Sequence, residues 1–128
     1  MKVKVCKLLA LIFITIFALS AANTVHAVGV ITSTIPVGNE PEGLAYDSAK
    51  GEIFVANGFS SSVSVISDSS NSVVTTINLA SSPGPIVYDS GKGEIFAANY
   101  ANPGVVYVIS DTNNSVIATV PVGASPWL

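Results

Sequence analysis

The stretch YDSAKGEIF at residues 46–54 returns almost unchanged as YDSGKGEIF at residues 88–96. Shorter matches follow each copy in the same order: Ala-Asn, then Val-Ile-Ser-Asp, then Asn-Ser-Val. A repeat of about 42 residues, built from short β-branched runs and turn residues, indicates a repeat architecture in which each unit packs against its neighbours.

Each repeat contains four strand signals rich in β-branched or aromatic residues. They lie at residues 43–46, 52–56, 62–67 and 73–79 of the first copy, and at 85–88, 94–98, 105–110 and 116–122 of the second. Four antiparallel strands in a repeat of about 42 residues make one blade of a β-propeller. We therefore expect an all-β fold, namely an incomplete β-propeller with two four-stranded antiparallel blades and a partial blade at each end.

The segments between the predicted strands have turn chemistry. Residues 47–51 and 89–93 begin with Asp, which can accept bonds from the turn backbone, and end with Gly, which adopts a positive φ at little cost. Residues 68–71 and 111–114 end with Asn, which tolerates the left-handed region. Both patterns predict hairpins.

The links between repeats mark the limits of each blade. Pro41 and Pro83 lie in the links from a fourth strand to the next first strand, where we expect them to end pairing and to set a bend. Residues 30–38 align with the fourth strand of the later copies, so they predict an outer strand without inner partners.

Two blades are fewer than the four to eight that propellers usually contain. They would leave broad apolar faces in water. Residues 121–126 also begin a third copy of the repeat. We therefore expect the sequence to be part of a longer repeat array, and the alternative is a ring assembled from several chains.

The strand motifs carry a family resemblance. FVAN at residues 54–57 and FAAN at 96–99 stand where the YVTN repeat has its four-residue motif, and IPVG at 35–38 and VSVI at 63–66 fit the surrounding pattern. The chain resembles the YVTN family of β-propeller repeat proteins over residues 31–128. The resemblance implies an exported protein, often of an archaeal or bacterial cell surface, with a propeller similar to the lactonase-like and quinoprotein-like groups.

The N-terminus predicts a signal peptide over residues 1–27, followed by the repeat region over residues 28–128. Three lysines precede an apolar stretch at residues 8–19, and Val-His-Ala at 25–27 offers a small-residue cleavage site. The alternative is a membrane anchor, but the stretch is shorter than the roughly 20 residues that span a bilayer. We expect a secreted or cell-surface protein without a stable membrane span after cleavage.

Cleavage after Ala27 would remove Cys6 and His26, the chain's one thiol and one imidazole. Residues 28–128 then cannot form a disulfide, a Ser-His-Asp triad or the usual zinc, haem and iron–sulfur sites, so we expect no cofactor and no catalysis by this region. They contain two lysines and eight acids, a net charge of −6. With no basic stripe, nucleic acid is not an expected partner.

The candidate ligand-binding residues lie in the loops at the end of the blades where the chain enters the inner strands, namely Glu40, Glu42, Asn57, Asn99 and Tyr100. Each has a structural alternative: the acids as solvated loop residues, the asparagines as partners of turn backbone, and the tyrosine as a packing residue. The same choice between contact and packing holds for Phe59 and Tyr107. Asn113 begins a glycosylation sequon on a predicted turn.

Three functions remain open. The first is an exported extracellular or cell-surface scaffold that binds an extracellular protein or a polar ligand. The second is a fragment of a lactonase-like or quinoprotein-like enzyme whose active site lies in other blades. The third is a small repeat protein that self-associates through its open blade faces into a full propeller.

Export is directly testable. We expect that the full chain, expressed in a bacterial host, is recovered outside the cytoplasm with Val28 as its first residue, as measured by intact mass and N-terminal sequencing. A product that keeps Met1 and stays in the membrane fraction would favour the anchor.

Overall fold

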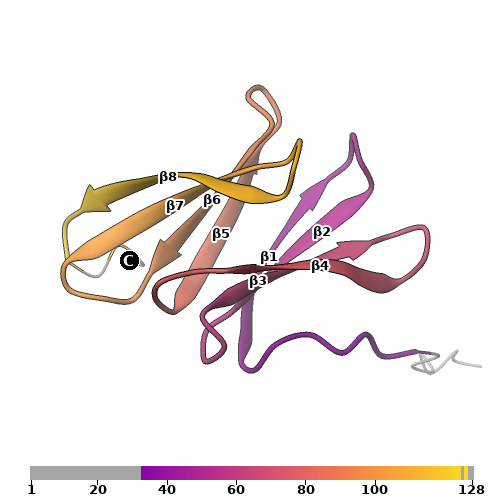
Figure 1. Ribbon diagram of the computed structural model, residues 1–128, viewed down its shortest axis with the longest axis horizontal. Helices are drawn as coiled ribbons and strands as arrows, with labels where there is room; N and C mark the ends of the chain where they lie inside the picture. Colours follow the sequence, from indigo (N-terminus) through magenta and orange to yellow (C-terminus); the bar gives the residue numbers. More distant parts are fainter. Residues whose placement is uncertain (1–32, 125, 127–128) are drawn as a thin grey trace, which may run out of the picture. The chain divides into compact units, whose positions relative to one another are not determined.

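Eight β-strands form two four-stranded sheets in the computed structural model, which describes residues 33–124 and 126 (Figure 1). The first sheet contains β1 (Pro41–Asp47), β2 (Glu52–Asn57), β3 (Ser62–Ser67) and β4 (Ser72–Asn78). The second contains β5 (Pro83–Asp89), β6 (Glu94–Asn99), β7 (Gly104–Ser110) and β8 (Ser115–Val122). Each sheet pairs its strands antiparallel in chain order, so both predicted blades are confirmed.

The described residues form no helix, and so none that is long and apolar enough to cross a membrane. The predicted signal peptide at residues 1–27 lies outside the described residues. Residues 33–40 precede β1 and form no strand. The expected outer strand at residues 30–38 is therefore not seen over 33–38, because a strand needs a partner for its backbone groups. Residues 30–32 lie outside the described part.

The two link prolines do not end pairing as predicted. Pro41 is the first residue of β1 and pairs with Asn57, and Pro83 is the first residue of β5 and pairs with Asn99. The register shifts directly after each proline. Proline is tolerated at the first residue of a strand and beside a bulge, because the missing N–H then costs no regular ladder bond.

The turn residues adopt the expected backbone conformations. Positive φ angles occur at Gly51 (65°), Gly93 (69°), Asn71 (49°) and Asn114 (53°). Asp47 Oδ1 accepts a hydrogen bond of 2.8 Å from the Ala49 amide, and Asp89 Oδ1 accepts one of 2.9 Å from the Gly91 amide. In each inner hairpin the aspartate thus accepts a hydrogen bond from the turn backbone, and the glycine supplies the positive φ that the turn needs.

A second set of bonds joins the two hairpins of each blade. In the first blade the Gly51 carbonyl accepts a bond of 2.9 Å from the Asp68 amide, and the Tyr46 hydroxyl donates one of 2.9 Å to Asp68 Oδ2. Gly51 has a φ of 65°, which strains any other residue, and a Cβ on it would lie 2.5 Å from Asp68 Oδ1 and would displace this carboxylate. The same arrangement recurs in the second blade at Gly93, Tyr88 and Asp111. This explains why Tyr, Gly and Asp recur in both copies.

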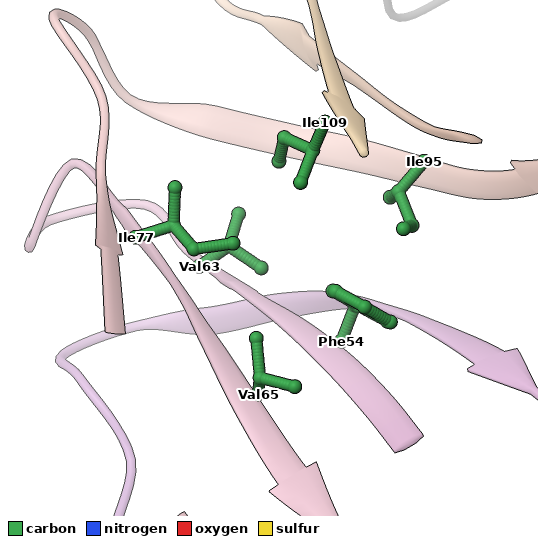
Figure 2. Close-up of a cluster of buried hydrophobic side chains, with 6 residues drawn as sticks. All are labelled: Phe54, Val63, Val65, Ile77, Ile95 and Ile109. Carbon is green, nitrogen blue, oxygen red and sulfur yellow. The ribbon is translucent and has the colours of Figure 1, made fainter. Parts of the chain in front are cut away.

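The core lies between the two sheets. Phe54 pairs with Val65 across β2 and β3, and Val63 pairs with Ile77 across β3 and β4, so all four side chains share one face. That face packs against the second sheet, where Ile95 and Ile109 complete the buried cluster shown in Figure 2. Its members are Phe54, Val63, Val65, Ile77, Ile95 and Ile109. Their burial is the main apolar stabilisation of the contact between blades.

Polar contacts at the turn end of the strands also join the blades. Lys50 Nζ donates to the carbonyl oxygen of Asp111 and lies 3.4 Å from Asp111 Oδ1. Asn114 Nδ2 donates to the Glu52 carboxylate, 3.3 Å from Oε1. We call these four residues the turn clasp. It connects the inner hairpin of the first blade to the outer hairpin of the second.

The electrostatic environment of Asp111 reflects this clasp. Burial acts to raise the pKa of Asp111, but hydrogen bonds from Tyr88 and Lys50 and the positive charge of Lys50 outweigh it and hold the pKa below its usual value. Burial, followed by hydrogen bonds to Asp111 and Asp47, raises the pKa of Tyr88 far above its usual value. The stability that Asp111 adds is therefore present above its unfolded-state pKa and is lost as the pH falls through its folded-state pKa.

Phe54 and Phe96 occupy the same position in the two blades and provide a matched pair. Phe54 is fully buried between the sheets, whereas Phe96 is half-buried on the far face of the second sheet. Phe54→Ala should lower the free energy of unfolding by about 3 to 5 kcal/mol, and Phe96→Ala by only about 1 kcal/mol, as measured by urea denaturation of dilute protein. Equal losses would contradict packing of the sheets through the Phe54 face.

Candidate ligand-binding site

The site is built where the chain enters each inner strand. In the first blade, the Gly58 amide in the β2–β3 loop donates a bond of 2.8 Å to the Glu40 carbonyl in the link before β1. In the second blade, the Tyr100 amide in the β6–β7 loop donates one of 3.3 Å to the Ser82 carbonyl in the link before β5. The loops and links predicted to share one end of the blades therefore do so.

Glu42 and Tyr100 meet at this end although they belong to different blades. Glu42 lies in β1, and Tyr100 directly follows β6. A hydrogen bond to Glu42 is the main cause that raises the pKa of the Tyr100 phenol, with smaller effects of burial and of the negative charges of Glu42 and Glu40. The phenol thus donates a hydrogen bond to the carboxylate, and the negative charge of the carboxylate disfavours the phenolate.

A reciprocal exchange of large and small residues makes room for this pair. Gly58 and Tyr100 follow the equivalent asparagines of the two blades, and Glu42 and Gly84 are the second residues of the equivalent strands β1 and β5. In the first blade the Glu42 carboxylate lies over Gly58, so that a Cβ there would come within 2.6 Å of Oε1. In the second blade the Tyr100 ring lies over Gly84, where a Cβ would overlap it. Each blade therefore carries one large side chain resting on one glycine.

Two further exposed side chains complete the group. Glu40 has a φ of 56°, and its carboxylate lies beside that of Glu42, since Oε2 would be 3.4 Å from a Cβ on Gly58. Phe59, the next residue in the loop, is 79% exposed. We call Glu40, Glu42, Phe59 and Tyr100 the loop-end cluster. It combines carboxylates, which accept hydrogen bonds and attract cations, with aromatic rings, which supply apolar area and cation–π contacts.

Asn57 does not join the loop-end cluster. Its side chain is fully buried, and its Nδ2 donates to the hydroxyls of Ser62 (3.2 Å) and Ser64 (3.0 Å). Its Oδ1 is also buried and finds no donor among the described residues. Asn57 therefore links β2 to β3 within its own blade. It does so through the hydroxyls of two serines of β3 and not through the turn backbone that the structural alternative predicts.

Asn99 and Tyr107 are likewise engaged inside the second blade. Asn99 Oδ1 accepts a bond of 2.8 Å from the Val105 amide, as the structural alternative predicts, and its Nδ2 donates to the Ser81 hydroxyl at 2.9 Å. The Tyr107 hydroxyl lies 2.7 Å from the same Ser81 oxygen, and its side chain is buried. Ser81 thus fastens the link between the blades to β6 and β7. Tyr107 is a packing residue in this structure.

The sequence missed the pairing of Glu42 with Tyr100. The available signal was that both residues break the repeat, each where the other blade has glycine. Among residues 33–124 and 126, no group of three or more His, Cys, Asp or Glu side chains could hold a metal ion. Asn113 is exposed on the β7–β8 turn, as predicted, and its glycosylation stays a prediction.

Comparison of the sequence with protein-family models and with curated proteins gives no match. Solved structures are similar in fold. The chain superposes on "Kuenenia stuttgartiensis Hydrazine Synthase" with a TM-score of 0.69 at 20% identity, over 74% of this chain and 28% of that one. It superposes on apo AztD from Citrobacter koseri with a TM-score of 0.62 at 11% identity, over 72% of this chain and 26% of that one.

These similar structures are β-propeller proteins, and at such low identity they show the fold alone. The chain spans about a quarter of the length of the chains it matches. Together with the two four-stranded blades, this establishes the class: the described chain is an incomplete β-propeller.

Removing one charge should separate the roles of the two acids. Because the hydrogen bond to Glu42 is the main cause of the raised pKa of Tyr100, Glu42→Gln should move this pKa back toward 10, whereas Glu40→Gln should lower it less. Tyrosine ring signals followed by NMR during a high-pH titration would resolve Tyr100 from the other tyrosines. If Glu40→Gln had the larger effect, the proposed pairing of Glu42 with the phenol would be wrong.

Proposed function

We propose that this chain is an exported β-propeller module that acts outside the cell or at its surface as a binding or structural scaffold, with no catalysis of its own. The observation that carries the proposal is the loop-end cluster, which places two acids and two aromatic side chains in the open at one end of the blades. Both blades contribute to it, so the cluster depends on the propeller arrangement.

The chemistry of the cluster favours a cationic contact group. Glu40 and Glu42 concentrate negative charge at a protein that is itself acidic, with a formal net charge of −3 for the full chain. Phe59 follows Gly58, over which the Glu42 carboxylate lies, and its ring is 79% exposed, so the same loop offers an aromatic ring to an ammonium or guanidinium group. The partner is therefore an extracellular protein or polar ligand that presents lysine, arginine or another amine.

Export is inferred from the first 27 residues and from the resemblance to the YVTN repeat proteins. The positive N-terminus, the short apolar stretch and the Val-His-Ala site have the order of a secretory signal. The scarcity of charge, with 10% charged residues, and the wealth of Val, Ser, Thr and Asn also suit a surface protein. The scaffold role is consistent with rigid strands that display variable loops.

A model cation tests the binding role. Hexalysine should bind the full chain in a titration calorimeter at low ionic strength, and the double variant Glu40→Gln, Glu42→Gln should bind it roughly five- to tenfold more weakly. Added salt should reduce the difference, because the contacts are exposed.

The matched control removes the same charge at the other end of the strands. Asp68→Asn with Glu94→Gln changes the net charge equally but leaves the loop-end cluster intact. It should weaken hexalysine binding by less than twofold if the cluster is the contact site. Equal weakening by both double variants would mean that net charge alone attracts the peptide, and the cluster would then not be the binding site.

A further inference from the structure

Each blade has two different faces, and the structure shows how one fits the other. The forward face of the first blade carries Ala45, Phe54, Ala56, Val63, Val65 and Ile77. It is covered by the rear face of the second blade, from which Ile95 and Ile109 enter the buried cluster while Ile86 and Tyr88 pack against it (Figure 2). The chain thus contains one observed forward-to-rear contact between blades.

The second blade has its own forward face, which the other described sheet does not cover: Val87 and Val120 on it are exposed, although Val108 is buried. Its members are the counterparts of the buried set: Val87, Phe96, Ala98, Val106, Val108 and Val120. Val87 is 60% exposed, and a cavity of about 220 Å³ lies on this face, lined by Val87, Phe96, Ala98 and Val106 with Pro85 and Ile86. In the first blade the equivalent surface is covered by β5.

The first blade offers a rear face that matches this cavity. Leu44 and Tyr46 hold the positions that Ile86 and Tyr88 hold in the second blade. Leu44 is 64% exposed, although Ile86 packs against the buried cluster. Residues 36–38 line a groove over the outer part of this rear face. The part open to contact lies at β1, where Leu44 and Tyr46 are exposed, whereas Val55 of β2 on the same face is buried.

Each blade also carries the residues for one half of a second turn clasp, on the side that faces away from the other blade. Lys92 and Glu94 occupy the positions of Lys50 and Glu52, and Lys92 is exposed. Asp68 and Asn71 occupy the positions of Asp111 and Asn114, and both are exposed. The forward side of the second blade therefore carries the half of a clasp that holds a lysine and a glutamate, and the rear side of the first blade carries the half that holds an aspartate and an asparagine.

We propose that a second copy of this chain docks head to tail on the first, with the rear face of its β1–β4 sheet on the open forward face of the β5–β8 sheet. Leu44 of the one copy enters the cavity beside Phe96 of the other. Lys92 then meets Asp68, and Glu94 meets Asn71, in a repeat of the turn clasp. Such an interface is heterologous, so roughly two to four copies would close a ring of four to eight blades.

Sedimentation velocity of the full chain over about 1 to 100 μM tests the proposal. The wild-type chain should form species larger than the monomer, increasing with concentration. Leu44→Glu should weaken this association at least tenfold, because it places a charge in the apolar cavity.

Val74→Glu is the matched control. Its counterpart in the second blade, Ile117, stays 53% exposed beside the observed contact between blades, so Val74 should lie outside the new contact too. This variant should associate like the wild type. A wild-type chain that stays monomeric throughout, its open face covered by other means, would overturn the proposal, as would equal weakening by Leu44→Glu and Val74→Glu.

A charge swap tests the orientation. Lys92→Glu and Asp68→Lys should each weaken association roughly tenfold, and the two together should restore it, because opposite charges again face each other across copies. Since Asp68 also binds Tyr46, far-UV circular dichroism of each variant must first match the wild type. If Asp68→Lys does not fold, the comparison of Leu44 with Val74 decides. A double variant weaker than both single variants would contradict head-to-tail docking.

Discussion

The constraint on which the structure depends is that a blade is apolar on both faces. In β2, Phe54 points to one face and Val55 to the other, and both are buried. A four-stranded sheet of this kind cannot present either face to water without losing much of the apolar burial that stabilises it. At the cluster around Phe54, the second blade packs on one face of the first blade and covers it. The polar contacts between the blades, namely the turn clasp and the pair of Glu42 with Tyr100, lie at the two ends of this apolar contact.

The residues that recur in the sequence hold each blade together as a unit that can pack in this way. Tyr46, Gly51 and Asp68 fix the two hairpins of a blade to each other, and their counterparts do the same in the second blade. The residues that do not recur have another task. Glu42 and Tyr100 each stand opposite a glycine in the other blade and meet at the loop end. Repetition thus marks the framework, and its interruption marks the candidate site.

Much of the fold could be predicted from the sequence because period-2 alternation and turn chemistry are local signals. Gly51 and Asn71 take the left-handed conformations that their positions imply. Pro41 was misjudged because its tolerance depends on the bulge and on its place at the start of the strand. The pairing of Glu42 with Tyr100 joins two blades, so it depends on how sheets pack, and no local pattern in one repeat determines that.

The loop-end cluster and the turn-clasp contacts between blades are found at opposite ends of the strands. The loop-end cluster lies where the chain enters the inner strands, and the turn clasp lies at the opposite ends of the same strands. Since β1 and β2 carry Glu42 at one end and Glu52 at the other, a partner at the loops and a neighbouring blade at the turns need not compete for the same side chains. Blade packing can therefore remain constant while the loops change, which is how a rigid repeat comes to serve different ligands.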